Sequence, residues 1–437
     1  MATEWRGEQS FARVASGRSA IANTGMAKAP QSRKECEALD MDDPLQRARQ
    51  AFALPEKIIY LDGHSLGPAT HEAIRRVSHA AEREWGGGLI RSWNDAGGGD
   101  GWIDLPLRVG QRIAGLIGAE PDEVIVADSV SVNLFKLAAA AMGLANTKTL
   151  LVEESEFPTD QYVAEGLAGI KGGTLKRVGA DQAISTLGRE PVVLIKSVVN
   201  YRTALVADIA AHEEAATKTG SVIVWDLSHA AGVLELDLNQ QGAWLAAGCT
   251  YKFLNGGPGA PAYLFVRGDL AEKLSNPIPG WMGHAAPFAF DPGYAPRAGV
   301  ARFAAGTPGI LSLSALDGAL DAFNGTDIQL VERKARALGD LVLARTKAMG
   351  LEAISPADPS LRGGHVSVRH PEGYAVVQAL IARGVIADFR APDCMRFGVS
   401  PLFLRYADIW DAMDALADVL ASAEWDKPEF KTRAVVT

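Results

Sequence analysis

Short apolar segments alternate with helix-like segments between about residues 120 and 270, and this alternation constrains the fold more than any other feature. Each apolar segment is rich in Val, Ile and Leu and is bounded by polar residues, Gly or Pro, as buried strands are. The expected strands are 124–129, 149–155, 192–198, 221–228 and 261–267, and the expected helices include 131–144 and 204–220. Strands that alternate with helices predict an α/β fold, with a mostly parallel sheet covered on both faces.

Ligands of such sheets bind beyond the carboxyl ends of the strands, so residues that directly follow the strands are candidates for function. Asp226 closes one expected strand, and His229 follows three residues later. Lys252 lies 26 residues after Asp226, in the segment GCTYKFLNGGPG. Two further groups follow other strands: Phe157-Pro158-Thr159-Asp160, and Ser129-Val130-Ser131 at a strand-to-helix junction.

Pyridoxal 5′-phosphate (PLP) needs residues of these types. Its aldehyde bonds to a lysine amine, for which Lys252 is the candidate. Its ring nitrogen stays protonated beside a carboxylate such as Asp226, and its flat ring packs on an aromatic side chain such as Phe157. Its phosphate binds at a helix N-terminus such as 129–131. Each residue alone has an ordinary structural explanation, as a cap, a core residue or a surface lysine, and only their order and spacing together point to PLP.

Composition excludes several other classes of protein. Apolar residues make up 48% and charged residues 22% of the chain, which is typical of globular proteins. The net charge of -9 argues against a nucleic-acid partner, and no apolar run is long enough to predict a membrane span. Cys36, Cys249 and Cys394 fit neither a disulfide framework nor a metal motif. We therefore expect free thiols, a cytoplasmic location and no metal.

The length of 437 residues predicts a large domain and a smaller one. Residues 1–40 lack the apolar core of a secretory signal and are expected to form a disordered leader, with Met26 or Met41 as alternative starts. Residues 41–70 are expected to join the small domain at the entrance of the active site. Residues 71–310 would form the large PLP-binding domain. A helical run over 311–350 and strand-like segments after it predict a small α+β domain over 311–437.

Many segments resemble one family, kynureninase, within the class V aminotransferase fold. They are YLDGHSLGP (60–68), GLIRSWN (88–94), ESEFPTDQYVAEGLA (154–168), WDLSHAAG (225–232), TYKFLNGGPG (250–259), GWMGH (280–284), ARFAAGTPGI (301–310), HPEGYAVVQALIARGVIADFR (370–390) and MRFGVSPLF (395–403). The similarity is to bacterial kynureninases and covers about residues 45 to 425. It implies a fold type I PLP-dependent enzyme with a seven-stranded sheet.

The resemblance also implies roles for individual residues. Lys252 would carry the cofactor and move protons, Asp226 would hold the ring nitrogen, and Tyr251 would be a phosphate ligand and a candidate proton donor. The other implied cofactor contacts are Val130, Ser131, Phe157, Pro158, Thr159, Asp160, Ser197 and His229, with Trp281 and Thr307 reaching in from the second subunit of a homodimer. The implied substrate contacts are Arg396, which would bind the α-carboxylate, together with Ser65 and His64.

The chain departs from the family pattern at three places. His64 stands where the family usually has Asn, and Val130 stands where bacterial relatives have Thr. The Gly-rich stretch 96–102 is longer than usual and is expected to form a mobile loop near the entrance. These departures concern the substrate pocket and one phosphate donor rather than the cofactor itself.

The implied reaction is hydrolytic cleavage of the Cβ–Cγ bond of L-kynurenine to anthranilate and L-alanine, a step of tryptophan catabolism and NAD biosynthesis. Three alternatives stay open: 3-hydroxykynurenine as the preferred substrate, a cysteine desulfurase and an aminotransferase. A desulfurase needs a nucleophilic cysteine after the lysine, and Cys394 follows Lys252 by 142 residues. Because reactive thiols need an exposed electropositive site, an inert and partly buried Cys394 is the better interpretation.

Overall fold

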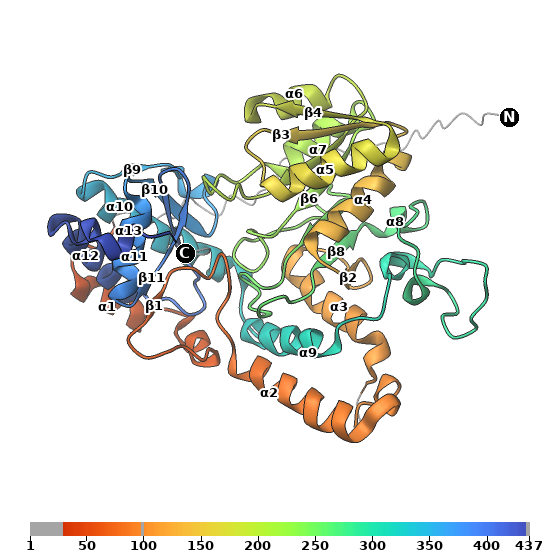
Figure 1. The fold of residues 1–437 in the computed structure, drawn as a ribbon, viewed down its shortest axis with the longest axis horizontal. Coiled ribbons are helices and arrows are strands. Elements are labelled where there is room, and N and C mark those ends of the chain that lie inside the picture. Colours follow the sequence, from red (N-terminus) through yellow and green to blue (C-terminus); the bar gives the residue numbers. More distant parts are fainter. Residues whose placement is uncertain (1–28, 98–99, 434–437) are drawn as a thin grey trace.

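The computed structural model describes residues 29–97 and 100–433 and shows two lobes side by side (Figure 1). The larger lobe contains a seven-stranded sheet in the order β2-β8-β7-β6-β5-β3-β4. Its strands are β2 (Val124–Val126), β3 (Thr149–Glu153), β4 (Thr174–Val178), β5 (Val193–Ser197), β6 (Val222–Asp226), β7 (Leu245–Gly248) and β8 (Tyr263–Val266). Only β8 runs antiparallel, to both β7 and β2. The predicted α/β fold with a mostly parallel sheet is confirmed.

Helices cover both faces of this sheet because each buried strand is apolar on both sides. Along β6, Ile223 and Trp225 belong to one hydrophobic cluster, while Val222 and Val224 belong to the other. The first cluster includes residues of α3 (Leu105–Ile117), α7 (Ile209–Thr217) and α9 (Ile310–Ala319). The second includes residues of α4 (Val130–Leu144) and α5 (Pro158–Lys171).

The smaller lobe, blue in Figure 1, is built on an antiparallel sheet in the order β12-β13-β10-β9. Its strands are β9 (Glu352–Ala353), β10 (His365–Arg369), β12 (Asp388–Arg390) and β13 (Cys394–Gly398). Its helices include α10 (Ile328–Ala348), α11 (Gly373–Ala382) and α12 (Tyr406–Ala421). β1 (Ile59–Tyr60) pairs in parallel with β11 (Val385–Ile386), so the segment before the large domain joins this lobe.

The expected helical run over 311–350 is two helices rather than one. A short 3-10 helix (Leu320–Phe323) and a loop over 324–327 separate α9 from α10, and Gly325 in this loop has a φ of +71°, which ends a helix easily. α9 packs against α3 and lies along α2 (His71–His79) in the larger lobe. The chain therefore crosses between lobes after α9 and not at residue 311, where the domain boundary was expected.

The expectation of a disordered leader over 1–40 is wrong for its last part. Ser32 caps the helix α1 (Arg33–Met41), which packs against α12. Cys36 is fully buried there, and the Asp40 carboxylate accepts the backbone N–H groups of Tyr406 and Ala407 at the start of α12. This capping satisfies orphan donors of α12, which explains why the segment is ordered. Residues 1–28, and with them Met26, lie outside the described part of the chain.

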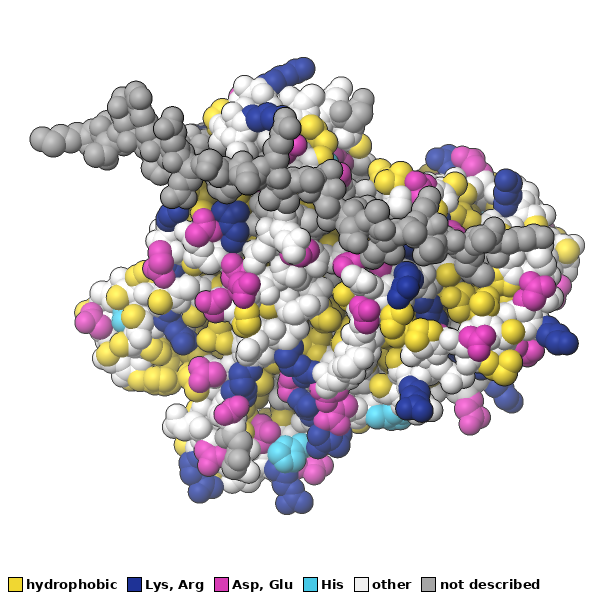
Figure 2. Space-filling model, turned by 180° about the vertical axis from the view of Figure 1, so that it is seen from behind, with side chains coloured by type: hydrophobic (Ala, Val, Ile, Leu, Met, Phe, Trp, Pro, Cys, Tyr) yellow, Lys and Arg dark blue, Asp and Glu magenta, His cyan; other side chains and the backbone are white. Residues whose placement is uncertain are grey.

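The surface seen from behind carries acidic and basic side chains that are interspersed rather than gathered by sign (Figure 2). Among the helices of residues 29–97 and 100–433, none is long and apolar enough to cross a membrane.

Candidate active site

The neighbouring strands β6, β5 and β3 bring the first candidate residues to one edge of the sheet. Asp226 ends β6 and is paired in register with Ser197, which ends β5. The segment 157–160 follows β3 and forms the start of α5, with Pro158 as its first residue. The carboxyl ends of parallel strands meet at this edge, as expected for a ligand site.

Two buried carboxylates lie together at this edge. The Asp160 side chain is 1% exposed, and its Oδ2 atom has no hydrogen-bond partner among the described residues. Burial and the nearby negative charges of Asp226 and Glu156 raise the pKa of Asp160 well above its ordinary value. Asp226 is buried as well, and its Oδ1 accepts the Ser228 N–H at 2.8 Å. A buried acid pair with an unpaired oxygen fits a cationic donor such as a protonated pyridine nitrogen.

Glu156 is a buried neighbour of this pair that the sequence analysis missed. The Ser197 hydroxyl donates to its Oε1, and the Ser197 N–H donates to its Oε2 at 2.9 Å. Burial raises the pKa of Glu156. Ser197 was expected among the cofactor contacts, and in the structure its hydroxyl donates to Glu156.

Lys252 lies in the loop after β7, opposite the turn that follows Asp226. Its Nζ is 3.5 Å from Nδ1 of His229 and 5.8 Å from the centre of the Tyr251 ring. His229 is buried, and burial together with the positive charge of Lys252 lowers the pKa of its imidazole well below the ordinary value. A neutral imidazole beside the amine places no second positive charge there.

The motif 60–68 supports the lysine loop. The Gly67 N–H donates to the Tyr251 carbonyl at 2.7 Å. A Cβ atom on Gly67 would overlap with the Lys252 carbonyl oxygen, so only glycine permits this approach. The motif therefore fixes the backbone on which Lys252 stands.

The candidate phosphate site lies at the start of α4. Ser129 is its N-cap and accepts the Val132 N–H at 3.4 Å, and Val130 and Ser131 form the first turn. The N–H groups of a first turn have no partner within the helix, which makes them anion donors. The hydroxyl of Tyr251 is a further candidate, and burial raises its pKa, so it is a neutral donor.

Phe157 offers an aromatic surface next to the acid pair. The side chain is 39% exposed, at the N-cap of α5, and its ring contacts that of Tyr201 edge-on at 5.2 Å between centres. Thr159 is partly buried in the first turn of α5, between Phe157 and Asp160. An exposed aromatic face next to buried acids is suited to pack on a flat heteroaromatic ring.

The candidate carboxylate-binding residue Arg396 is held by the neighbouring strand. Its side chain is 2% exposed and forms a two-point ion pair with Asp388, with Nε 2.7 Å from Oδ1. Nη1 donates to the Tyr201 carbonyl at 2.7 Å, and Nη2 lies 3.3 Å from the Ser65 hydroxyl. Ser65 donates to Asp388 at 2.9 Å, so the structure brings Arg396 and Ser65 together as expected.

His64 was expected among the substrate contacts, and the structure buries it completely. Its ring is 0% exposed and stacks on that of His365 with 5.1 Å between centres. The sequence analysis missed His365 and Asp388: His365 stands outside the quoted motifs, and Asp388 stands within the segment 370–390 but was given no role there.

Trp281 and Thr307, the residues expected to act from a second subunit, are both exposed. Trp281 stands in a short 3-10 helix (Trp281–Gly283) and contacts Phe288 edge-on at 5.5 Å. Phe288 and Phe290 are 58% and 78% exposed. Within the described residues, neither Trp281 nor Thr307 makes a hydrogen bond or ring contact with the residues around Lys252.

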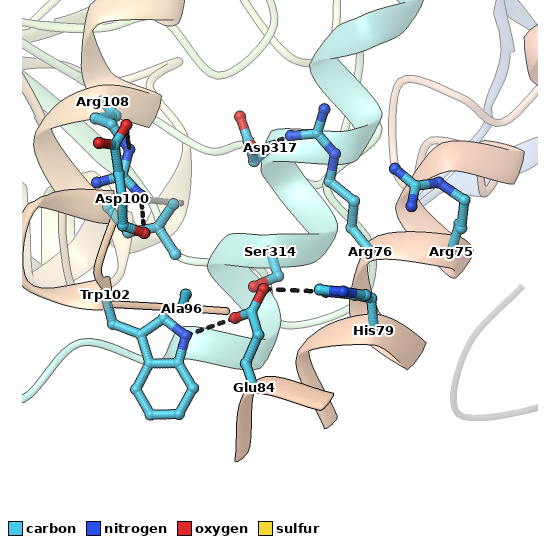
Figure 3. A pocket seen from close by; sticks show the side chains of 11 residues that line it. Arg75, Arg76, His79, Glu84, Ala96, Asp100, Trp102, Arg108, Ser314 and Asp317 are labelled. Atoms are coloured by element: carbon cyan, nitrogen blue, oxygen red, sulfur yellow. Dashed lines mark hydrogen bonds and ion pairs between the residues drawn. The ribbon is translucent and has the colours of Figure 1, made fainter. Parts of the chain in front are cut away.

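A separate pocket of about 260 Å³ lies between α2, the Gly-rich stretch and α9 (Figure 3). Glu84 accepts the Trp102 indole N–H at 2.6 Å and lies 3.2 Å from His79. Arg76 is paired with Asp317. None of the predicted site residues lines this pocket, and residues 98 and 99 of the Gly-rich stretch lie outside the described part of the chain.

Sequence comparison decides the family. A kynureninase of Pseudomonas fluorescens is 43% identical over 418 residues, which cover 93% of this chain and all of the relative. A kynureninase of Burkholderia mallei (strain SAVP1) is 44% identical over 419 residues, with the same coverage. The chain belongs to the kynureninase family. A family model for the kynureninase C-terminal domain also matches residues 331–416.

The fold agrees with this family. A C-DES variant with glycine covalently linked to its PLP cofactor matches with a TM-score of 0.73 at 18% identity, over 85% of this chain and 99% of that one. The cysteine desulfurase CsdA of Escherichia coli matches with a TM-score of 0.70 at 17% identity, over 87% and 98%. Kynureninases are PLP-dependent hydrolases, so the predicted enzyme class and cofactor are confirmed at the level of the family.

Proposed function

We propose that this kynureninase hydrolyses the Cβ–Cγ bond of L-kynurenine to give anthranilate and L-alanine, with PLP held on Lys252. The observation that carries the proposal is the arrangement of Lys252 beside a buried acid pair, Asp160 and Asp226, whose unpaired oxygen suits a protonated ring nitrogen. Release of fluorescent anthranilate from L-kynurenine tests the proposal directly. A holoenzyme that releases none would contradict it.

Each part of the cofactor has residues that fit it. Lys252 would hold the aldehyde carbon, and Asp226 and Asp160 would hold the ring nitrogen. Phe157 would cover one face of the ring. The first turn of α4 and the Tyr251 hydroxyl would bind the phosphate. PLP, when bound, supplies an electron sink for the bonding electrons that are released at the substrate carbons.

Side chains of the protein would carry out the proton transfers. The Lys252 amine, once displaced by the substrate amine, would take the proton from the substrate Cα. The neutral His229 ring leaves that amine without a competing cation. The Tyr251 hydroxyl, which burial keeps protonated, would return a proton to Cβ of the alanine product.

Arg396 would bind the substrate α-carboxylate, with Ser65 as a second donor. The planar guanidinium fork suits a carboxylate, and the ion pair with Asp388 holds the fork in one orientation. Fixing the carboxylate positions Cα and Cβ against the lysine amine.

We assign L-kynurenine rather than 3-hydroxykynurenine as the preferred substrate because the relatives described above are bacterial. The ratio of kcat/KM for the two substrates tests this assignment. A clear preference for the hydroxylated substrate would reverse it and leave the reaction class unchanged.

We also propose a homodimer in which each active site is completed by residues of the second subunit. Trp281, Phe288 and Phe290 are exposed aromatic side chains of one segment, and Trp281 contacts Phe288 edge-on. A second subunit would cover them and receive Trp281 and Thr307 at its cofactor. Active holoenzyme of monomeric mass in light scattering would contradict this arrangement. The free, buried cysteines of the described chain are consistent with a cytoplasmic location.

A desulfurase activity is disfavoured by Cys394. Its side chain is 0% exposed, its thiol lies 3.9 Å from the Arg202 carbonyl, and burial raises its pKa. A thiol that attacks substrate sulfur must be exposed and deprotonated.

A further inference from the structure

The His64 ring lies in a buried site between two carboxylates. Its Nδ1 is 3.6 Å from Asp62 Oδ1, and its Nε2 is 3.7 Å from Asp388 Oδ1. Both ring nitrogens lack a hydrogen-bond partner among the described residues. A Cβ atom on Gly398 would overlap with Nδ1, so the glycine makes room for the ring. Unpaired nitrogens on a fully buried imidazole are costly, and a second state of the protein in which they are paired would explain why they are kept.

Asp388 connects His64 to the proposed carboxylate site. It binds Arg396 at two points, Arg390 at 2.9 Å and the Ser65 hydroxyl at 2.9 Å. A guanidinium has five N–H donors. In Arg396 they contact Asp388 twice, Ser65 once and the Tyr201 carbonyl once, which leaves one N–H for a ligand. A substrate carboxylate that takes two N–H groups must therefore displace one of these partners, and Asp388, which holds two of the four contacted N–H groups, is the partner of like charge.

Because the substrate carboxylate and Asp388 compete for one guanidinium, we infer that His64 takes up a proton when substrate binds Arg396 and then becomes a hydrogen-bond partner of Asp388. His64 is thus a positioning residue that acts through Asp388, and it does not touch the substrate. The inference rests on the proposed role of Arg396. One negative charge enters with the carboxylate and one proton enters from solvent, so the net buried charge is unchanged.

The electrostatics of the site agree with this exchange. Burial and the positive charge of Arg396 lower the pKa of His64, so the ring is neutral before substrate binds. Asp388 and Asp62 act in the opposite direction, and loosening Asp388 from Arg396 strengthens their effect. The other titratable or charged groups that face the ring or its two histidine neighbours are His365, His229 and Lys252, and Arg390 is paired with Asp388. The pKa of both neighbouring histidines is lowered well below the ordinary value, and among the described residues neither is paired with a carboxylate as His64 is, so neither supplies the charge.

Proton uptake can be counted by calorimetry. L-alanine is titrated into holoenzyme near neutral pH in buffers of different ionisation enthalpy, for the unaltered protein, His64→Asn and the exposed control His71→Asn. On binding L-alanine, the unaltered protein and the control should each bind as much as about one proton more per site than His64→Asn does, because the variant lacks one imidazole. Equal uptake by all three proteins would overturn the inference. His64→Gln replaces His64→Asn if circular dichroism shows that the latter is not folded.

Steady-state kinetics supply a second readout. The KM of the unaltered enzyme should rise with pH by up to about tenfold per unit between the pKa of His64 in the free enzyme and its higher pKa in the complex, and should level off above the latter. The pH profile of kcat should be the same in both proteins. His64→Asn should lack this rise in KM, and an identical KM profile would overturn the inference. An unaltered enzyme that neither binds L-alanine nor releases anthranilate would overturn both the inference and the proposed function. A change confined to kcat would assign His64 to another role.

Discussion

Nζ of Lys252 lies 3.5 Å from Nδ1 of His229, a buried imidazole that is kept neutral by its surroundings. The two residues stand on different loops, one after β6 and one after β7, and these strands are parallel neighbours. The contact explains why the spacing between Asp226 and Lys252 indicates a site. This spacing brings the ends of two neighbouring strands together at one edge of the sheet. The same edge carries the acid pair that is proposed to hold the ring nitrogen.

Replacing the charged partner of the ring nitrogen should impair chemistry more than folding. For Asp226→Asn we expect kcat to fall on the order of 10²-fold, since a charge-assisted hydrogen bond is lost. Asp160→Asn should lower kcat by a smaller factor, because burial and its acidic neighbours already raise the pKa of Asp160 well above its ordinary value. Single-turnover rates of anthranilate release check the order of the two effects. Equal rates for Asp226→Asn and the unaltered enzyme would exclude the assigned role.

The shape of the Arg396 side chain should matter as well as its charge. Arg396→Lys keeps a cation but loses the planar fork and both N–H groups on Asp388. We expect KM for L-kynurenine to rise roughly 30- to 100-fold, with a smaller change in kcat. Arg383→Lys, on a surface ion pair with Glu424, is the matched control. A KM that Arg396→Lys leaves unchanged would remove Arg396 from the substrate site.

Three buried histidines should make folding sensitive to acid. Burial lowers the pKa of His64, His229 and His365 in the folded state, so the unfolded chain binds more protons below about pH 6.5. Their contribution to stability is complete above that pH and is lost as the pH falls. Urea unfolding of the unaltered protein and of His365→Leu, at several pH values between about 5 and 8, isolates the contribution of His365 to the pH dependence of stability. We expect the stability of the variant to fall less on acidification, by up to about 1.4 kcal/mol per pH unit. Parallel pH profiles would contradict this account.

Glu213 should make the folded protein less stable as the pH rises, which is the opposite of the effect of the buried histidines. Its Oε1 accepts the Trp225 indole N–H at 2.7 Å, and burial raises its pKa to about 8. The folded state therefore keeps a proton that the unfolded chain loses, and stability falls as the pH rises from the ordinary glutamate range through about 8. Glu213→Gln should lose less stability between about pH 5 and 9, by on the order of 1–3 kcal/mol. Chemical unfolding at the two pH values measures the difference, and a variant that loses more than the unaltered protein would refute the assignment.

The strands that the sequence predicted were those with a strong apolar pattern. β4 was missed because it is an edge strand with Lys176 and Arg177 at its centre, and β7 because its small residues, Leu-Ala-Ala-Gly, resemble a loop. α1 was missed because a short polar segment gains its order from α12, which is distant in the sequence. These misses share one cause, since tertiary contacts decided structures that local propensity did not.

The candidate site was predictable where residues stand in local motifs at strand ends. Asp226 is the last residue of β6, Lys252 lies in the loop after β7, and Phe157 and Asp160 lie where the chain passes from β3 into α5. Asp388 could not be found in this way, because its role depends on β12 pairing with β13 beside Arg396. The burial of His64 was equally hidden, because it results from the packing of Gly398 and His365 against the ring.

The most direct test of the central claim combines absorbance and product release. Purified protein is scanned between about 300 and 500 nm for the absorbance of bound PLP, and L-kynurenine is then added while anthranilate fluorescence is followed, for the unaltered chain and Lys252→Ala. The account predicts a yellow protein that releases anthranilate, with both properties lost in Lys252→Ala. A colourless protein that PLP cannot reconstitute, or a Lys252→Ala variant that still releases anthranilate, would contradict it.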